Sequence, residues 1–460
     1  MSIQTVNPFN NKVVQSFEEM SEVTLDNLVA QSAEAFESWK KTSYEHRTEM
    51  LIKVSKLMRE RKAELAKTIT LEMGKLIAQA EAEIDLSADI FDYYAEHGPT
   101  FLADKYLNPK FGKAYYKQSP LGTILGVEPW NFPFYQVARF AAPNLMIGNT
   151  VLVKHASMVP QCAIAIEKLF IDAGVPVGVY TNLLISGKRA SALVSDTRIK
   201  GVSLTGSEEA GSSIAEQAGK YIKKSVLELG GSDAYIVLED ADIDEAVKWG
   251  IIGRINNNGE CCVAAKRFIV VQEIADEFLE KFTQQMKNLV LGDPMNPKTQ
   301  LGPLSSEDAA VHIADQVKKA IDAGAKLLLG GTRTNCEGAF MDPTILTDIK
   351  PENPVYYQEL FGPVVSYYVV KDENEAIKLA NDSSYGLGCS IFSNNIDRAK
   401  NIANHIDAGM VTINHPTWTT AELPFGGTKN SGYGRELSEL GIQEFVNRKL
   451  VRISEFSDPM

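Results

Sequence analysis

Short apolar runs alternate with segments of helical period through the middle of the chain, and this alternation limits the fold more than any other feature. The apolar runs cover 123–127, 150–153, 201–204, 225–229 and 235–238, and the helical segments include 161–173, 208–218 and 244–250. Strands separated by helices are joined by crossovers, which place the strands parallel and the helices on both faces of the sheet. The sequence therefore predicts an α/β fold with a doubly wound parallel sheet.

The same alternation starts again after about residue 231. Helices are expected at 275–289, 307–323, 373–381 and 394–407, and strands at 326–329, 364–370, 389–392 and 410–414. The region 24–100 has apolar residues every three or four positions, which is typical of helices that pack on a neighbouring surface. We expect a second α/β unit at 231–435, after a first unit formed by 1–105 and 122–230.

Two strand-like runs, 113–118 and 449–454, have no neighbouring run in the sequence with which to pair. Unpaired strand edges favour pairing between subunits. We therefore expect 106–121 and 436–460 to form an oligomerisation flap in a homodimer or homotetramer.

The composition narrows the classes of partner. The 460 residues carry a formal net charge of −13, which repels the phosphate backbone of nucleic acids. No apolar run approaches the ~18 residues that cross a bilayer, and the chain starts without a basic segment followed by an apolar one. The five cysteines are few and odd in number, which disfavours a disulfide framework. We expect a cytoplasmic protein that binds neither nucleic acid nor membranes.

A search for nucleotide-binding loops finds no G-x-G-x-x-G after an early strand and no phosphate loop. The nearest match, at 432–434, follows no strand. A strand does end at Leu204, and the helix that follows could present Gly206 and Ser207 to a pyrophosphate. Ser207 could equally be a plain helix cap, and both interpretations stay open on these residues alone.

Five motifs occur in an order that resembles the aldehyde dehydrogenase superfamily along essentially the whole chain, from Leu71-Glu72-Met73-Gly74-Lys75 to Ser431-Gly432. The motifs are Pro129-Trp130-Asn131-Phe132-Pro133, Val226-Leu227-Glu228-Leu229-Gly230-Gly231, Asn258-Gly259-Glu260-Cys261-Cys262, Glu359-Leu360-Phe361-Gly362-Pro363 and Pro424-Phe425-Gly426-Gly427. The resemblance implies that 1–105 with 122–230 binds a dinucleotide and that 231–435 carries the catalytic thiol.

The implied chemistry needs three groups. An aldehyde becomes a good hydride donor only after a nucleophile makes its carbon tetrahedral, and Cys262 resembles the family's thiol nucleophile. The oxyanion that forms needs fixed donors, which the resemblance assigns to the Asn131 amide and the Cys262 backbone N–H. Glu228 resembles the general base that hydrolyses the resulting thioester. A turn asparagine and a surface glutamate are the simpler alternatives for Asn131 and Glu228.

The resemblance also implies NADP or NAD as cofactor, bound without a G-x-G-x-x-G loop. The residues that match the family's cofactor contacts are Trp130, Lys154, Ser157, Gly206, Ser207, Glu359 and Phe361. Ser157 stands where many NAD-preferring members carry glutamate. Because a glutamate there would repel the 2′-phosphate of NADP, we expect this chain to accept NADP and to favour it.

The substrate prediction depends on Arg139, eight residues after Asn131, where succinate-semialdehyde dehydrogenases of this family are similar in having arginine. A guanidinium can hold a carboxylate with two hydrogen bonds. Tyr135 lies four residues earlier on the same helix face, and Thr419 and Thr420 resemble a hydroxyl pair for the same carboxylate. We therefore expect oxidation of succinate semialdehyde to succinate. An arginine on a solvated helix face is the alternative.

Three positions depart from the family pattern or add to it. Asn256 replaces a second arginine, and Glu260 replaces the usual glutamine before the thiols. Cys261 could form a reducible disulfide with its neighbour Cys262, although adjacent cysteines demand unusual geometry. Cys162, Cys336 and Cys389 lie in apolar segments, where a small buried hydrophobic residue is the default.

The sequence is also compatible, to different degrees, with other functions. A broad-range aldehyde dehydrogenase for other semialdehydes or neutral aldehydes is the main alternative, and a catalytically silent homologue is a remote one. An acylating enzyme that uses coenzyme A is disfavoured because Glu228 is present. A metal enzyme is disfavoured because the six histidines form no ligand spacing, so we expect no metal site.

Overall fold

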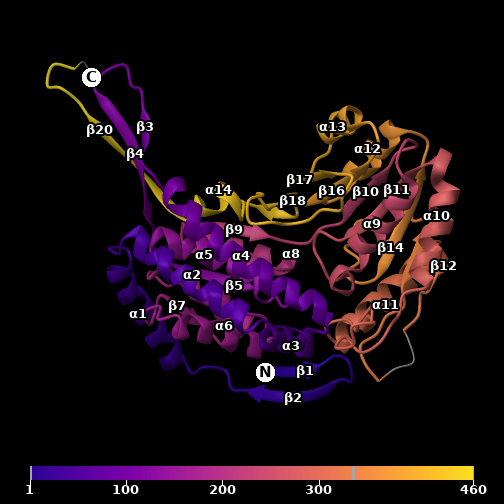
Figure 1. The fold of residues 1–460 in the computed structure, drawn as a ribbon, viewed down its shortest axis with the longest axis horizontal. Helices are drawn as coiled ribbons and strands as arrows, with labels where there is room; N and C mark the ends of the chain where they lie inside the picture. Colours follow the sequence, from indigo (N-terminus) through magenta and orange to yellow (C-terminus); the bar gives the residue numbers. More distant parts are fainter. Residues whose placement is uncertain (1–2, 334–336, 459–460) are drawn as a thin grey trace.

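Two large sheets and one small sheet organise the computed structural model, which describes residues 3–333 and 337–458 (Figure 1). The first unit, drawn in indigo and magenta, lies beside the second, drawn mainly in orange. The small sheet projects from the first unit at the far end from the second. Cys336 lies outside the described residues.

The sheet of the first unit has six strands in the order β19-β9-β8-β5-β6-β7. All pairs are parallel except that of β19 with β9. The strands are β5 (Thr123–Glu128), β6 (Thr150–His155), β7 (Tyr180–Asn182), β8 (Ile199–Thr205), β9 (Lys224–Glu228) and β19 (Gly432–Tyr433), and the helices among them are α5 (Tyr135–Ile147), α6 (Pro160–Asp172), α7 (Gly187–Leu193) and α8 (Glu208–Lys220).

Alternate residues of the central strands pack into different hydrophobic clusters. Ile124 and Val151 belong to one cluster, whereas their neighbours Leu125 and Leu152 belong to another. Both faces of the sheet are therefore covered, as a parallel sheet requires. The prediction of a doubly wound α/β fold is confirmed.

The second unit contains a seven-stranded sheet in the order β12-β13-β14-β11-β10-β16-β17, parallel except for β12. Its strands are β10 (Asp233–Val237), β11 (Ala265–Val271), β12 (Lys326–Leu329), β13 (Thr344–Thr347), β14 (Val364–Val370), β16 (Gly388–Phe392) and β17 (Met410–Ile413), with helices α9 (Ile243–Ile255), α10 (Gln272–Lys287), α11 (Glu307–Asp322), α12 (Glu373–Asn381) and α13 (Ile396–Ala403). Two of these strands, β11 and β13, lie outside the ranges predicted above.

Four helices precede the first sheet: α1 (Glu22–Trp39), α2 (Tyr44–Glu60), α3 (Lys62–Met73) and α4 (Ile77–Phe101). Of these, α1 packs on the strands of the sheet, whereas α2, α3 and α4 pack on one another and on α5 and α6. The longest, α4, packs along both α2 and α5. None of the helices in the described ranges is long and apolar enough to cross a membrane. A hairpin of β1 (Ile3–Asn7) and β2 (Lys12–Phe17) runs below these helices, and β15 (Tyr385–Gly386) pairs with β18 (Thr428–Lys429).

The two strands expected to be unpaired pair with each other. β4 (Lys113–Pro120) runs antiparallel to β20 (Val446–Ile453), and the short β3 (Lys105–Leu107) completes a three-stranded sheet. Sequence order could not reveal this pairing because more than three hundred residues separate the two strands. The short helix α14 (Ser438–Ile442), inside the predicted flap segment, packs instead against α4 and α5.

Candidate active site

Cys262 lies in a sharply bent loop between α9 and β11. A 3₁₀ turn at Asn256–Gly259 precedes the thiol, and Asn257 and Asn258 have left-handed backbones with φ of 52° and 56°. Asparagine tolerates this conformation better than most residues. The Asn258 amide donates to the carbonyls of Gly74 at 3.0 Å and Pro303 at 2.8 Å, which ties the bend to distant segments.

Two cavities meet at the Cys262 thiol. One, of about 390 Å³, is lined by α4, α5 and 417–425, and the other, of about 250 Å³, is lined by the ends of the strands of the first sheet. Cys262 and Gln136 line both cavities. Molecules in the two cavities would therefore both lie next to Cys262.

The smaller cavity brings together most of the predicted cofactor residues. Its walls include Trp130, Gly206, Ser207, Glu359 and Phe361. The rings of Trp130 and Phe361 meet edge to face at 5.8 Å, and the carboxylate of Glu359 pairs with Lys266 at 3.0 Å. Ser207 caps α8 by accepting a hydrogen bond from the Ala210 N–H, and its role toward a pyrophosphate stays a prediction.

Lys154 and Ser157 lie outside the walls of this cavity. Lys154 is buried on β6, and burial lowers the pKa of its ammonium group. Ser157 is exposed two residues beyond β6. Lys154 lies at the carboxyl end of the parallel strand β6 and Ser157 follows it, which is where this class of sheet binds nucleotides. Their positions fit the adenosine end of a dinucleotide.

The larger cavity contains the predicted hydroxyl groups but not the predicted guanidinium. Tyr135, Thr419 and Thr420 line it, and the hydroxyls of Tyr135 and Thr419 are 2.9 Å apart. Arg139 lies behind this wall with a side chain that is 0% exposed. The structure thus corrects the expectation that Arg139 faces the aldehyde directly.

Buried partners hold Arg139 in place. Its Nε pairs with the Glu436 carboxylate, Nη1 donates to the Tyr135 hydroxyl at 3.1 Å, and Nη2 donates to Thr205 at 3.0 Å. The Phe425 ring lies 4.4 Å from the guanidinium. Burial opposes the charge of Arg139, but Glu436, with smaller contributions from Tyr135, Glu228 and Cys262, outweighs this effect and raises the pKa of the guanidinium. Arg139 is separated from the cavity by Tyr135 and Phe425, both of which line it.

Glu228 ends β9 and is buried, with neither carboxylate oxygen hydrogen-bonded within the described residues. Burial raises the pKa of this carboxyl group well above its usual range, and Arg139 counteracts part of the increase. Glu228 is not in the wall of either cavity, although its neighbours Leu229 and Gly230 are. A carboxyl group without a fixed partner next to the cavity is free to change its rotamer.

Asn131 follows β5 and lies in the wall of the smaller cavity. Its amide nitrogen donates only a long bond, 3.3 Å, to the Glu260 carbonyl. Its backbone carbonyl is held more firmly, by Lys75 at 2.8 Å and by the Asn257 amide at 2.9 Å. The backbone of Asn131 is fixed while its amide can still be offered to a ligand.

The two adjacent thiols interact. A hydrogen bond with Cys261 and burial raise the pKa of the Cys262 thiol. Both cysteines are free, and Cys261 is the more buried. The redox role of Cys261 stays a prediction.

Glu260 points away from the thiols. Its carboxylate accepts hydrogen bonds from the Ser305 N–H at 3.0 Å and the Ser305 hydroxyl at 2.8 Å. Burial raises the pKa of Glu260 to about 8. Glu260, in place of the usual glutamine, therefore anchors the thiol loop to Ser305. Its carboxylate does not interact with the Cys262 sulfur.

Some residues of the site had no signal in the sequence. Gln136, Glu83 and Glu436 lie in ordinary helical or turn contexts, and only folding brings them to the cavities or to Arg139. Lys75 belongs to a motif quoted above for the resemblance, but its spacing indicated no role. Gln136 directly follows Tyr135 at the start of the same predicted helix, and this position was the one signal that could have indicated its place near the cavity.

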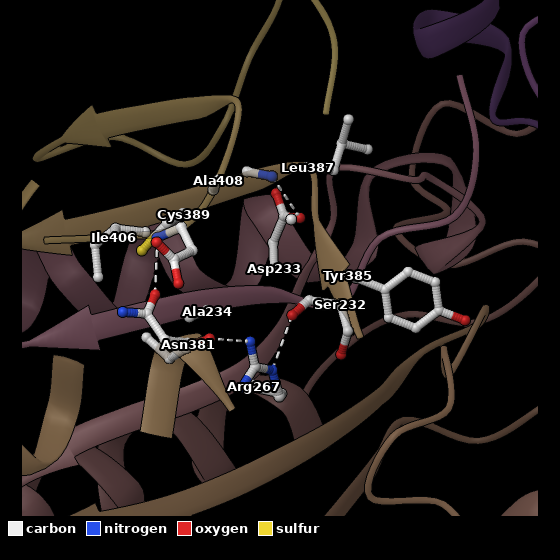
Figure 2. A pocket seen from close by; sticks show the side chains of 14 residues that line it. Ser232, Asp233, Ala234, Arg267, Asn381, Tyr385, Leu387, Cys389, Ile406 and Ala408 are labelled. Atoms are coloured by element: carbon white, nitrogen blue, oxygen red, sulfur yellow. Dashed lines mark hydrogen bonds between the residues drawn. The ribbon is translucent and has the colours of Figure 1, made fainter. Parts of the chain in front are cut away.

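A third hollow lies outside this site. Figure 2 shows Asp233 and Arg267 among its walls, with Arg267 donating to the carbonyls of Ser232 and Ala380. Asp233 accepts the Gly388 N–H at 3.0 Å. The hollow is about 10 Å³, room for roughly one water molecule. The buried Cys389 lies in its wall, on β16. No cluster of metal-ligating side chains occurs within 3–333 and 337–458.

Comparison with known proteins agrees with this geometry. Residues 1–451 match the model of the aldehyde dehydrogenase family, and the chain belongs to that family of oxidoreductases. It is 50% identical to a succinate-semialdehyde dehydrogenase [NADP(+)] of Deinococcus radiodurans, over 97% of this chain and 94% of that protein. It is 46% identical to a probable succinate-semialdehyde dehydrogenase [NADP(+)] of Synechocystis, over 99% and 100%.

Among solved structures, the chain is similar to succinic semialdehyde dehydrogenase from Streptococcus pyogenes, described in complex with NADP+ as the cofactor. The TM-score is 0.97 at 46% identity, covering 98% of this chain and 100% of that one. Similarity at this level covers both α/β units and the small sheet.

Proposed function

We propose that this protein oxidises succinate semialdehyde to succinate with NADP as the hydride acceptor. The observation that carries the proposal is the meeting of two cavities at Cys262, one suited to an aldehyde and one to a nicotinamide. The named relatives support both the substrate and the cofactor.

The order of steps follows from the groups present. The Cys262 sulfur forms a bond to the aldehyde carbon, and the carbonyl oxygen becomes an oxyanion held by the Asn131 amide and the Cys262 N–H. The tetrahedral carbon is then able to release a hydride, and NADP bound in the smaller cavity would supply the acceptor. Glu228 takes a proton from water as its oxygen attacks the thioester carbon, and the C–S bond then breaks, which releases the acid and regenerates the Cys262 thiolate.

Glu228 must reach the thioester for the last step. Its carboxylate has no fixed partner within the described residues and lies next to two residues of the cofactor cavity wall. Rotation of this side chain toward the sulfur would bring the base to the water. Burial, which raises its pKa, also makes it a stronger base once it is ionised.

The substrate carboxylate needs donors in the larger cavity. The acidic side chains in its wall are neutralised: Glu83 by Lys75, Asp85 by Lys62 and Asp89 by Arg59. The hydroxyls of Tyr135 and Thr419 lie in the wall of the larger cavity, and Arg139 donates a hydrogen bond to the Tyr135 hydroxyl. We infer that these hydroxyls touch the carboxylate and that Arg139 polarises them.

Two isosteric variants test the substrate. Tyr135→Phe and Thr419→Val each remove one hydroxyl and keep the shape of the wall. We expect kcat/KM for succinate semialdehyde to fall about 10-fold for each, the scale of ~1.4 kcal/mol for a hydrogen bond to a charged group. Butanal, which has no carboxylate, is the control and should lose little. Equal losses on both aldehydes would leave a broad-range aldehyde dehydrogenase as the better conclusion.

For NADP, the proposal rests on Ser157 and Lys154. A serine in place of glutamate leaves the 2′-phosphate unopposed, and the Lys154 ammonium supplies positive charge beside β6. We propose that the cofactor-binding part is 1–105 with 122–230 and that the catalytic part is 231–435.

We also propose that the protein is a cytoplasmic homo-oligomer that assembles through the sheet of β3, β4 and β20. Exposed apolar side chains on or beside this sheet, including Tyr106, Leu450 and Ile453, support assembly. Four free cysteines in the described residues support a reducing compartment. Light scattering of the protein and of Leu450→Glu with Ile453→Glu tests the interface: the double variant should dissociate.

A further inference from the structure

A buried ion pair lies directly beneath the oxyanion residue. Lys75, just after α3, pairs with Glu83 of α4, and their side chains are 0% and 1% exposed. Neither residue has a role in the chemistry described above. A fully buried pair of charges is costly to desolvate, so its retention asks for an explanation other than stability.

Lys75 contacts the active site through the backbone of Asn131. Its Nζ donates to the Asn131 carbonyl at 2.8 Å and lies 3.6 Å from the centre of the Phe132 ring. The Asn257 amide donates to the same carbonyl at 2.9 Å. Two donors on one carbonyl fix the peptide plane from which the Asn131 side chain projects.

Glu83 contacts the next turn of the same segment. Its Oε1 accepts the backbone N–H of Phe134 at 2.8 Å and of Tyr135 at 3.2 Å, at the start of α5. These are N–H groups that a helix leaves without intrahelical partners. No side chain of α5's own N-terminus caps it, so Glu83 supplies the cap from another helix.

We propose that Lys75 and Glu83 form a positioning pair that fixes the Asn131 oxyanion donor, Lys75 through its carbonyl and Glu83 through the start of α5. The pair acts on the step in which the oxyanion forms, and ground-state binding of the cofactor and of an uncharged aldehyde does not depend on its charges. This inference rests on the proposed function, because it assumes that Asn131 is the oxyanion donor. An error below 1 Å in the placement of such a donor already weakens transition-state stabilisation.

A double-mutant cycle tests this pair. Lys75→Met should lower the first-turnover rate of cofactor reduction about 10- to 100-fold, a part of the ~10²- to 10³-fold cost of losing an oxyanion donor. The KM for butanal, which has no carboxylate for the unpaired Glu83 to repel, should stay within about threefold. In an Asn131→Ala background, Lys75→Met should cost almost nothing more, because the donor that it positions is already gone.

Glu83→Gln serves as the second variant if Lys75→Met does not fold. Glutamine keeps the volume and an acceptor for the α5 N–H groups but removes the charge that holds Lys75. It should also slow the first turnover and also lose its effect in the Asn131→Ala background.

Glu72→Gln is the matched control. Glu72 is equally buried, lies three residues before Lys75 and caps another helix, α6, through the N–H groups of Gln161 and Cys162. It touches no part of the Asn131 segment. Its first-turnover rate should match the unchanged protein.

Two other outcomes would contradict the positioning role of Lys75 and Glu83. If Lys75→Met costs the same factor with and without Asn131, or if Glu72→Gln is as slow, the pair is structural and the inference fails while the proposed function stands. If Asn131→Ala alone leaves the first turnover unchanged, both the oxyanion assignment and the positioning inference fail.

Discussion

The two cavities that meet at Cys262 are built in different ways. The cofactor cavity is lined by residues that directly follow parallel strands, such as Trp130 after β5, Gly206 after β8 and Gly230 after β9. The aldehyde cavity is lined by side chains from α4, α5, the thiol loop and 417–425. The positions of residues at strand ends are set by the strands themselves, whereas helix side chains line a cavity in orientations that depend on what packs behind them.

The fate of Arg139 shows what this difference means. Arg139 lies on α5, as the sequence predicted. Its guanidinium forms an ion pair with Glu436 and does not line the cavity. In the cofactor cavity, by contrast, Gly206 and Ser207 lie where the strand and helix boundaries alone would put them. Variants on either side, and at the sulfur between them, can sharpen this contrast.

The largest effect is expected where the cavities meet. Cys262→Ala should abolish cofactor reduction, a loss on the order of 10⁴-fold or more, because no thiohemiacetal can form. Glu228→Gln should still give one burst of reduced cofactor and then stall at the thioester. Stopped-flow absorbance of the reduced cofactor separates the two. A missing burst in Glu228→Gln would remove Glu228 from the hydrolytic step.

On the aldehyde side, Arg139→Met should destabilise the protein by ~3 to 5 kcal/mol, because it leaves the Glu436 carboxylate buried without its cation. Adding Glu436→Gln should restore part of the loss. Urea unfolding measures the free energy of unfolding of the single and the double variant. Lys318→Met, which breaks an exposed pair with Asp322, is the control and should cost less than ~1 kcal/mol. Additive losses in the double variant would show that Arg139 and Glu436 are not coupled.

On the cofactor side, Ser157→Glu should move the preference from NADP toward NAD. The added charge would oppose the 2′-phosphate by roughly 1 to 4 kcal/mol at ~4 Å. The ratio of kcat/KM for the two cofactors is the measurement, and Ser157→Ala separates the loss of the hydroxyl from the gain of charge. An unchanged ratio in Ser157→Glu would show that another residue selects the cofactor.

Beneath the thiol loop, Glu260→Gln should change how stability depends on pH. Burial raises the folded-state pKa of Glu260 to about 8, so its carboxyl group costs stability once it ionises. As pH rises from the ordinary pKa toward 8, the unchanged protein should lose up to about 1.4 kcal/mol per unit relative to Glu260→Gln. Unfolding free energies at several pH values test this. Parallel curves for the two proteins would contradict it.

The smallest expected effect concerns the neighbouring thiol. Mild peroxide should inactivate the protein in a way that a thiol reductant reverses, through a Cys261–Cys262 disulfide. Cys261→Ala should lose that reversibility. If Cys261→Ala recovers equally well, Cys261 has no protective role.

The sequence by itself determined the fold class, the family and the residues at strand ends. Strand and helix periodicity depends on local chemistry, and Trp130, Gly206 and Glu228 sit at boundaries that this periodicity defines. For the same reason the thiol at Cys262 and the amide at Asn131 could be assigned from motifs alone.

Only the tertiary structure decided which charged groups pair. The Lys75–Glu83 and Arg139–Glu436 pairs join segments from 8 to nearly 300 residues apart, and β4 pairs with β20 across most of the chain. Burial makes an unpaired charge so costly that its side chain turns to whatever opposite charge the fold brings near. That choice depends on three-dimensional neighbours, so no local pattern in the sequence can show it.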